Sequence, residues 1–436
     1  MDQEALIGLY CFLGMLVFIL AGVPIFLPMM ISAVIGFWLI GGPTFALAQA
    51  TTAVYNITSD YAFAVLPMFV LMGTIAGECG IAEDAYKAMS KWVMKIRGGL
   101  LMATIGANAL FGACSGAPTG STLVFTKIAL PQLDKFGYDK RLSMACISSA
   151  AVLITLIPPS IPIIMTCILV DLSVGKTLMA GIIPGILTAL ALALTVWITG
   201  IINPKRVPVA MDIKITWRER FSSLKLLWPM VFLFLLVIGG LYAGVFPPTI
   251  AGAIGAAGTI VYAFSMRRMS WRKLYNAFWD SVVINAQIFP MIIGGMLFSR
   301  LIALSGLAQG FNDFLISVQL PPLGVLSIVI FFYIIMGCVM DLIAIIIITL
   351  PIVFPILTGL GFDPYAVVII LLFMGAIGSI TPPVGMSCFI VAIAAEEDAM
   401  EVFKGILPFF FVQLALVVLI IFIPSIASWL PSLIAQ

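Results

Sequence analysis

The chain has 436 residues, of which 63% are hydrophobic and only 9% are charged, and its net charge is +2. Soluble domains carry about 25% charged residues, so this composition excludes a soluble fold and makes the lipid bilayer the solvent for most of the surface. The charge gives no reason to expect a nucleic-acid partner. The absence of histidine excludes Ser–His catalytic pairs, histidine proton relays and zinc sites of the His-Glu-x-x-His kind.

Eight apolar segments approach the roughly 20 residues that a helix needs to cross a bilayer. In chain order they are 5–20, 22–41, 61–80, 177–202, 225–244, 249–266, 281–304 and 405–430. Two amphipathic segments of mixed charge, 81–97 and 212–223, are expected to lie along the cytoplasmic interface.

Four further apolar regions do not fit one simple helix. Regions 98–131 and 323–357 are expected to be re-entrant hairpins, because each arm of about 15 residues would reach roughly 22 Å as a helix, less than the roughly 30 Å of a bilayer core. Regions 141–171 and 365–395 are each divided by a Pro-Pro pair, which indicates a helix broken inside the membrane.

Lysine and arginine are distributed unevenly among the connecting segments. Segments 83–99, 132–141, 203–225 and 267–273 hold 17 of the 21, and segments 42–60, 305–322 and 358–364 hold none. The positive-inside rule places the first group in the cytoplasm and the second outside. Both termini are then expected to be periplasmic, and the two hairpins enter from opposite faces, 98–131 from the cytoplasm and 323–357 from outside.

The two halves of the sequence match at one fixed offset of 224 residues. The matched pairs are Cys114 and Cys338, Pro131 and Pro355, Gly137 and Gly361, Asp139 and Asp363, Pro158-Pro159 and Pro382-Pro383, and the Gly-Ile-x-Pro runs at 181–184 and 405–408. Because the charge pattern puts corresponding parts on opposite faces, the sequence predicts an all-α polytopic membrane protein built as an inverted repeat, 1–224 and 225–436. Such repeats with broken helices are typical of secondary transporters, whose site lies near the bilayer midplane.

The hairpin tips are candidates for contact with a solute. Small and hydroxyl residues fill the first tip, where Ser115, Gly116 and Thr119 are expected to face a cavity, since non-helical backbone at membrane depth is tolerated only in such places. Two intramembrane charges, Lys127 and Asp341, belong to the hairpins. Asp341 lies near the second tip, and both a structural role and a solute contact are open for it.

The Pro-Pro pairs are the other candidates. Proline has no amide hydrogen and clashes with an upstream carbonyl, so the carbonyl groups before Pro158-Pro159 and Pro382-Pro383 are released. Released carbonyls and the Thr381 hydroxyl suit a hard cation such as Na⁺, and the helix N-terminus after each break suits an anion such as a carboxylate. We therefore expect Pro159 and Pro383 to border the solute, with a simple kink as the alternative reading.

Four motifs at these places are specific when taken together. They are Phe-Gly-Ala-Cys-Ser-Gly at 111–116, Ile-Pro-Pro-Ser-Ile-Pro at 157–162, Gly-Ile-Ile-Pro-Gly at 181–185 and Thr-Pro-Pro-Val-Gly at 381–385. With them the whole chain resembles the large membrane subunit (DctM type) of the tripartite ATP-independent periplasmic, or TRAP, transporters. The sequence departs from the family pattern at 117–119, Ala-Pro-Thr, where that family often has small residues and a valine, and this bears on solute choice.

The resemblance implies a sodium-driven elevator importer in the bacterial inner membrane, acting with a small four-helix membrane subunit and a periplasmic substrate-binding protein. Its solute would be a small organic acid such as a dicarboxylate, a sialic acid or a sulfonate. One Na⁺ site would comprise Gly337, Gly378, Thr381 and Val384. The offset of 224 returns the mirror site, which comprises Ala113, Ile154, Ile157 and Ser160.

Two other functions stay open at this stage. A membrane-embedded hydrolase would use Ser115, and without histidine its base would have to be Lys127. A passive channel would need a continuous polar pathway, whereas two opposed hairpins favour alternating access. The sequence contains no Gly-x-x-x-x-Gly-Lys-Ser/Thr motif, so we do not expect this chain to hydrolyse ATP, and we do not expect it to be an enzyme.

Overall fold

A computed structural model of the chain describes residues 3–208, 215–307, 309–310 and 320–433, and these residues form helices joined by short connections. Nine of the described helical segments are long and apolar enough to cross a membrane, and the bent pair Lys140–Leu156 and Ile161–Leu169 would make a tenth. The all-helical polytopic fold predicted from composition is therefore confirmed.

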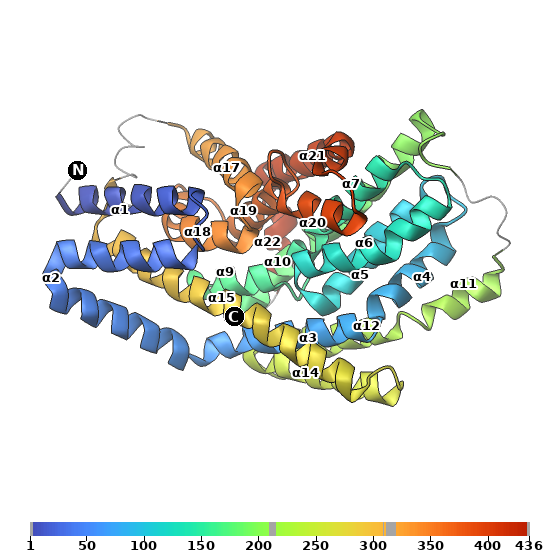
Figure 1. Cartoon of the computed structure of the whole chain (residues 1–436), viewed down its shortest axis with the longest axis horizontal. Helices are drawn as coiled ribbons and strands as arrows, with labels where there is room; N and C mark the ends of the chain where they lie inside the picture. The colour runs from blue at the N-terminus through green and yellow to red at the C-terminus, as the bar shows by residue number, and fades with distance from the viewer. Residues whose placement is uncertain (1–2, 209–214, 308, 311–319, 434–436) are drawn as a thin grey trace.

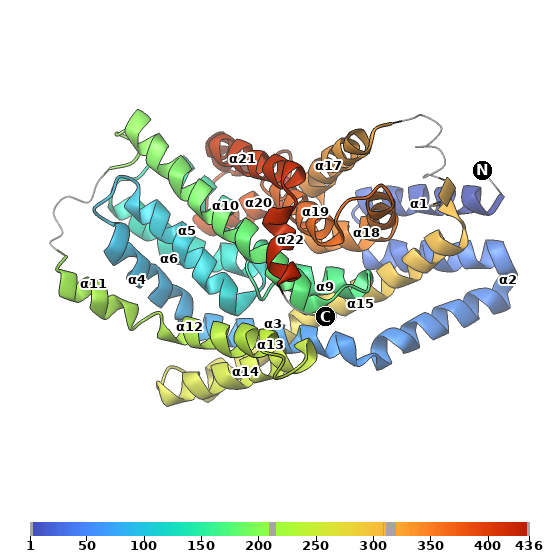
Figure 2. The ribbon, with the colours of Figure 1, turned by 180° about the vertical axis from the view of Figure 1, so that it is seen from behind.

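One group of helices, which we call the frame, comes from residues 3–93 and 217–304. It consists of α1 (Gln3–Leu20), α2 (Phe26–Ser59), η1 (Tyr61–Ala64), α3 (Val65–Glu78), α4 (Ile81–Val93), α11 (Trp217–Leu224), α12 (Trp228–Phe234), the π-helical turn η2 (Leu235–Gly239), α13 (Gly240–Tyr242), α14 (Pro248–Ser265) and α15 (Trp271–Leu304). Within the frame α2 packs on α15 and α3 packs on α14. Figures 1 and 2 show these four helices along one side of the molecule.

The remaining helices form the second group, which we call the hairpin bundle. It consists of α5 (Gly99–Ser115), α6 (Pro118–Lys135), α7 (Lys140–Ala150), α8 (Val152–Leu156), α9 (Ile161–Leu169), α10 (Val174–Ile202), α17 (Pro322–Val339), α18 (Leu342–Gly359), α19 (Pro364–Gly378), α20 (Met386–Ala395), α21 (Ala399–Phe422) and α22 (Ser425–Ser432). The hairpin α5–α6 extends toward the end of the molecule where α4 and α11 lie, and the hairpin α17–α18 extends toward the end where α1 lies (Figure 1).

The residues matched at the offset of 224 have the same local structural roles in both halves. Asp139 caps α7 and Asp363 caps α19, and each carboxylate accepts a hydrogen bond of 2.9 Å from the main-chain amide three residues later. Two residues before each cap, Gly137 and Gly361 have positive φ angles of 73° and 92°, which glycine adopts at no steric cost. The shared pattern thus encodes the same turn and helix start twice.

Several helices extend beyond the segments expected from hydropathy. α2 does not end at 41 but continues to Ser59 after a kink at Gly42, whose φ of 81° is non-helical. α15 begins at Trp271 instead of 281, and the segment 405–430 is divided into α21 and α22 by Ile423-Pro424. Hydropathy reports affinity for lipid and not helix length, so polar or proline-containing ends of helices escape it.

The hairpin arms and the amphipathic segments also differ in detail from expectation. Each arm has 17 or 18 residues instead of about 15, because α6 continues through Pro131 and α18 continues through Pro355. The segment 81–97 contains α4, whose buried face packs on α5, so it is part of the protein and not only an interfacial helix. Of 212–223, the described part includes most of α11; residues 212–214 lie outside the described residues.

Candidate solute and ion site

The first broken helix opens between α8 and α9. The fourth residue after Ile154 is Pro158, which has no amide hydrogen, so the Ile154 carbonyl loses its helical donor. Ser160 then starts α9: its hydroxyl donates to the Thr155 carbonyl at 2.7 Å and accepts from the Ile163 amide at 3.5 Å. This break therefore supplies an unpaired main-chain oxygen beside a fully buried hydroxyl group.

The tip of the first hairpin closes onto this break. The Gly116 carbonyl accepts a hydrogen bond of 3.2 Å from the Ile161 amide. Gly116 has a φ of +62°, and a Cβ atom there would lie 2.7 Å from the Pro159 carbonyl oxygen, so no other residue fits without displacing the backbone. On the neighbouring turn, Gly112 packs on Ile154, whose Cα would lie 3.4 Å from a Cβ at Gly112.

The second broken helix opens between α19 and α20 in the corresponding way. The fourth residue after Gly378 is Pro382, and the Gly378 carbonyl accepts instead from the Thr381 amide at 2.9 Å. The Thr381 hydroxyl donates to the Ile377 carbonyl at 2.8 Å. Because a hydroxyl oxygen that donates its hydrogen keeps its lone pairs, Thr381 can still bind a cation.

The tip of the second hairpin contacts its break through main-chain atoms. The Gly385 amide donates to the Cys338 carbonyl at 2.9 Å, and Gly385 corresponds to Ile161 at the offset of 224, so the same position donates in both halves. Nearby, α17 and α19 meet backbone to backbone: a Cβ atom at Gly337 would lie 2.6 Å from the Cα of Gly378. Each half therefore joins one hairpin tip to one proline break.

These two junctions bring together the residues of each expected ion site. In the first, Ala113 lies beside Gly112 on α5, and Ile154, Ile157 and Ser160 line the break. In the second, Gly337 touches Gly378, and Thr381 and Val384 flank Pro382-Pro383. The carbonyl groups of Ile157, Thr381 and Val384 accept no hydrogen bond from any residue in the described ranges. Neutral carbonyl and hydroxyl oxygens are ligands that suit a hard monovalent cation, so the donor set fits Na⁺.

The two junctions differ in their exposure. At the first, Pro158, Pro159 and Ser160 are buried. At the second, Pro382 and Pro383 are exposed, and Thr381 and Val384 are partly exposed. The two prolines expected to border the solute differ in the same way: Pro159 is buried and Pro383 is exposed.

The expected solute residues at the hairpin tips occupy different environments. Ser115 is 5% exposed, and its hydroxyl has no hydrogen-bond partner among the described residues. Thr119 is exposed in the first turn of α6, as is Lys127 two turns later, so neither contributes to a buried catalytic pair with Ser115. Asp341 caps α18 by accepting from the Ile343 amide at 3.1 Å, which establishes its structural role and leaves the solute contact as a hypothesis.

Buried polar residues inside the helices were not among the predicted site residues. The amide of Asn108 on α5 accepts a hydrogen bond of 2.6 Å from Ser121 on α6, and Asn108 is fully buried. Gln413 on α21, also fully buried, donates to the Ser149 carbonyl on α7 at 3.2 Å. A lone amide side chain in an otherwise apolar helix is the sequence signal that could have identified both residues.

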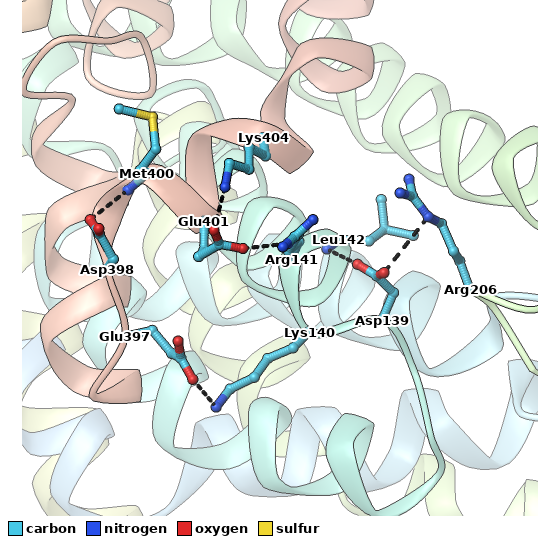
Figure 3. Close-up of polar contacts among 10 residues, drawn as sticks. All are labelled: Asp139, Lys140, Arg141, Leu142, Arg206, Glu397, Asp398, Met400, Glu401 and Lys404. Atoms are coloured by element: carbon cyan, nitrogen blue, oxygen red, sulfur yellow. Dashed lines mark hydrogen bonds and ion pairs between the residues drawn. The ribbon is translucent and has the colours of Figure 1, made fainter.

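Charged side chains gather where α7 and α21 begin (Figure 3). Lys140 pairs with Glu397 at 2.6 Å, and Glu401 pairs with both Arg141 and Lys404. Asp139, besides capping α7, lies 3.7 Å from Arg206. We call these seven residues the ionic cluster; they are Asp139, Lys140, Arg141, Arg206, Glu397, Glu401 and Lys404. The cluster ties the first broken helix to the second half of the chain.

Comparison with known proteins identifies the family from sequence and the fold from a solved structure. The family described as tripartite ATP-independent periplasmic transporter, DctM component, matches residues 12–426. The chain is 32% identical to the large permease protein of the ectoine/5-hydroxyectoine TRAP transporter of Ruegeria pomeroyi over 97% of this chain and 98% of that protein. It is 27% identical to the large permease protein of the C4-dicarboxylate TRAP transporter of Vibrio cholerae, over 97% and 96%. The YdaH transporter of Alcanivorax borkumensis shares the fold, with a TM-score of 0.61 and 16% identity over 87% of each chain.

Proposed function

Because the chain belongs to the DctM component family of tripartite ATP-independent periplasmic transporters, we propose that it is a sodium-coupled importer of a small organic acid that works by an elevator mechanism. Its membership makes it a multi-pass membrane transport protein and not an enzyme. The observation that carries the proposal is the pair of mirror-related junctions, each with a hairpin tip, a proline break and unpaired oxygens.

The chemistry of these junctions supports sodium coupling. A Na⁺ ion needs several oxygen ligands and no titrating group. The junctions offer the carbonyls of Ile157, Thr381 and Val384, which accept no hydrogen bond within the described residues, together with the Ser160 and Thr381 hydroxyls. Bound Na⁺ would supply positive charge next to the α9 and α20 N-termini, whose dipoles already favour an anion. Ion and anionic solute would therefore stabilise each other at the same place.

The class of solute is inferred from the relatives and the site together. The relatives transport, by their names, ectoine or 5-hydroxyectoine and C4-dicarboxylates, so a small organic acid is the class that we propose here. Ser115, Gly116 and Thr119 of the first tip, Asp341 of the second, and Pro159 and Pro383 of the breaks are the proposed surroundings of the solute. The open second junction would be its way in or out.

Movement as an elevator is suggested by how the frame holds the two halves of the hairpin bundle. In the first half, α3 packs on the tip of α5, where a Cβ at Gly73 would lie 2.5 Å from the Ser115 carbonyl oxygen. In the second half, the corresponding part of α15 packs on the middle of α18, with Gly295 against Ile347. The frame thus contacts the two matching hairpins at different points, which would correspond to one state of the transporter. In a second state the two hairpins would exchange these contacts, and the site would open to the other side of the membrane.

Partners and orientation complete the proposal. A component of a tripartite periplasmic system would receive its solute from a periplasmic binding protein and act with a small membrane subunit of four helices in the bacterial inner membrane.

Both termini would be periplasmic, by the positive-inside rule. Two exposed residues test this orientation. In a cysteine-free background, Gly359→Cys should react with an impermeant maleimide in intact spheroplasts, and Ser222→Cys only after permeabilisation; labelling of Ser222→Cys in intact spheroplasts would reverse the orientation.

Transport by the reconstituted complex tests the function. In proteoliposomes that contain this chain, the small subunit and the loaded binding protein, uptake of labelled solute should follow an inward Na⁺ gradient. Labelled solute should also exchange for unlabelled solute, which a channel or a hydrolase does not do. Uptake driven by a pH gradient in sodium-free buffer would contradict sodium coupling, and full activity of this chain alone would contradict the tripartite mode.

A further inference from the structure

Each hairpin contains one buried hydrogen bond between side chains of its two arms. In the first hairpin, Ser121 bonds to Asn108. In the second, the hydroxyl groups of Tyr333 on α17 and Thr349 on α18 lie 2.5 Å apart, and Tyr333 is fully buried. Asn108 and Tyr333 both lie about two helical turns before their tips, whereas Ser121 lies about one turn after its tip and Thr349 about two.

The direction of the second bond is determined by its neighbours. The Thr349 hydroxyl donates its only hydrogen to the Ile345 carbonyl at 2.7 Å. Thr349 can therefore only accept from Tyr333, and the Tyr333 phenol is the donor. A buried phenol without this acceptor would keep an unsatisfied polar group in an apolar interior, which is costly. The bond thus fixes the ring of Tyr333 against α18.

The main chain of Tyr333 lies at the second proposed ion site. Tyr333 is four residues before Gly337, which is one helical turn. Its carbonyl oxygen would lie 3.1 Å from a Cβ at Gly378, so α17 presents Tyr333 and Gly337 to the same glycine. The hydroxyl group of Tyr333 contacts α18, and its main chain contacts α19. A single residue therefore connects both arms of the hairpin to the broken helix.

We propose that Tyr333 and Thr349 are positioning residues for the second Na⁺ site. Their bond keeps the two arms of α17–α18 as one rigid unit and so sets the distance between the Gly337 region and the oxygens of Gly378 and Thr381. This inference rests on the proposed sodium coupling. The inference goes beyond sodium coupling for two reasons. Neither Tyr333 nor Thr349 touches the ion, and the second hairpin would have to move without separation of its arms.

Sodium dependence in the reconstituted complex tests the proposal. Tyr333→Phe and Thr349→Val each remove one hydroxyl and keep the shape of the side chain. Loss of a buried neutral hydrogen bond should raise the Na⁺ concentration for half-maximal uptake by about 2- to 12-fold. The double variant should show the same rise as either single variant, because both changes break one interaction. Half-saturation by solute at saturating Na⁺ should change little.

Matched variants separate this role from general stability. Tyr242→Phe removes the hydroxyl of another tyrosine, one that has no hydrogen-bond partner among the described residues, and should leave the Na⁺ dependence unchanged. The proposal is overturned if Tyr333→Phe and Thr349→Val lower thermal stability without changing Na⁺ dependence, or if their effects add. If either of these results is found while Thr381→Val still weakens Na⁺ binding, only the positioning role is wrong and sodium coupling stands. If Thr381→Val is also without effect, the assignment of the ion site itself is wrong.

Discussion

The two proline breaks have the same design but opposite surroundings. At the first, Pro158 and Pro159 are buried under the Gly116 tip, and the ionic cluster pairs charges at the start of the same broken helix. At the second, Pro382 and Pro383 are exposed. At the start of α19, where the mirror of the ionic cluster would lie, Lys176, Asp363 and Tyr365 line a cavity of about 460 Å³ together with residues of α22. A repeated sequence thus gives one enclosed and one open junction, which is what a carrier needs in any single state.

Chemical labelling gives the sharpest contrast between the two junctions. Ser160 and Val384 correspond at the offset of 224, and Ser160 is fully buried while Val384 is partly exposed. In a variant without the seven native cysteines, Val384→Cys should react with a small maleimide and Ser160→Cys should stay largely unreacted. Mass spectrometry of the intact protein measures both. Equal rates in the absence of solute and Na⁺ would show that the junctions do not differ in access.

Close backbone packing should make position 337 of the second junction sensitive to added volume, unlike its counterpart in the first half. At Gly337 a new Cβ would lie 2.6 Å from the Cα of Gly378, whereas the corresponding first-half residue, Ala113, already carries a Cβ. Overpacking typically costs about 1–3 kcal/mol, so Gly337→Ala should reduce Na⁺-driven uptake by about 5- to 150-fold.

The control for this change is Gly359→Ala at the end of α18. No atom lies within 4 Å of a Cβ at Gly359, so this variant should transport as the wild type does. Equal activity of Gly337→Ala and Gly359→Ala would mean that the contact between α17 and α19 does not position the site.

The ionic cluster should contribute less than either junction. Lys140 and Glu397 have side chains that are 43% and 34% exposed, and exposed ion pairs contribute about 0.2–1 kcal/mol. Glu397→Gln should therefore lower the unfolding temperature only slightly, and the difference should disappear at high salt, where exposed charges are screened. A large loss of stability that persists at high salt would show that the cluster holds the two halves together.

Much of this organisation could be predicted from the sequence, for identifiable physical reasons. Hydropathy indicated the spans, arm length and the distribution of Lys and Arg indicated the two hairpins, and the Pro-Pro pairs indicated both breaks, because proline acts locally wherever it occurs. The offset of 224 indicated that the two halves repeat. Exposure could not be predicted, since Pro159 and Pro383 have the same local sequence signal and differ only in what packs over them.

Contacts between residues far apart in the chain could likewise not be predicted from the sequence. The helical extension of α2 past Gly42 and the bond between Tyr333 and Thr349 depend on neighbours from elsewhere in the fold. A structural role for Asp341 was one of two open interpretations, and the cap on α18 became visible only from the position of the Ile343 amide.

The sodium dependence of uptake by Thr381→Val tests the central claim most directly. Valine keeps the shape of threonine and removes the oxygen that we place on the ion, and Thr358→Val is the control, because Thr358 makes the same bond to a carbonyl four residues earlier at 2.8 Å. Loss of one ligand at about 1–3 kcal/mol should raise the Na⁺ concentration for half-maximal uptake roughly 5- to 150-fold in Thr381→Val and leave Thr358→Val unchanged. An unchanged sodium dependence in folded Thr381→Val would contradict the assignment of this junction as a site of sodium coupling.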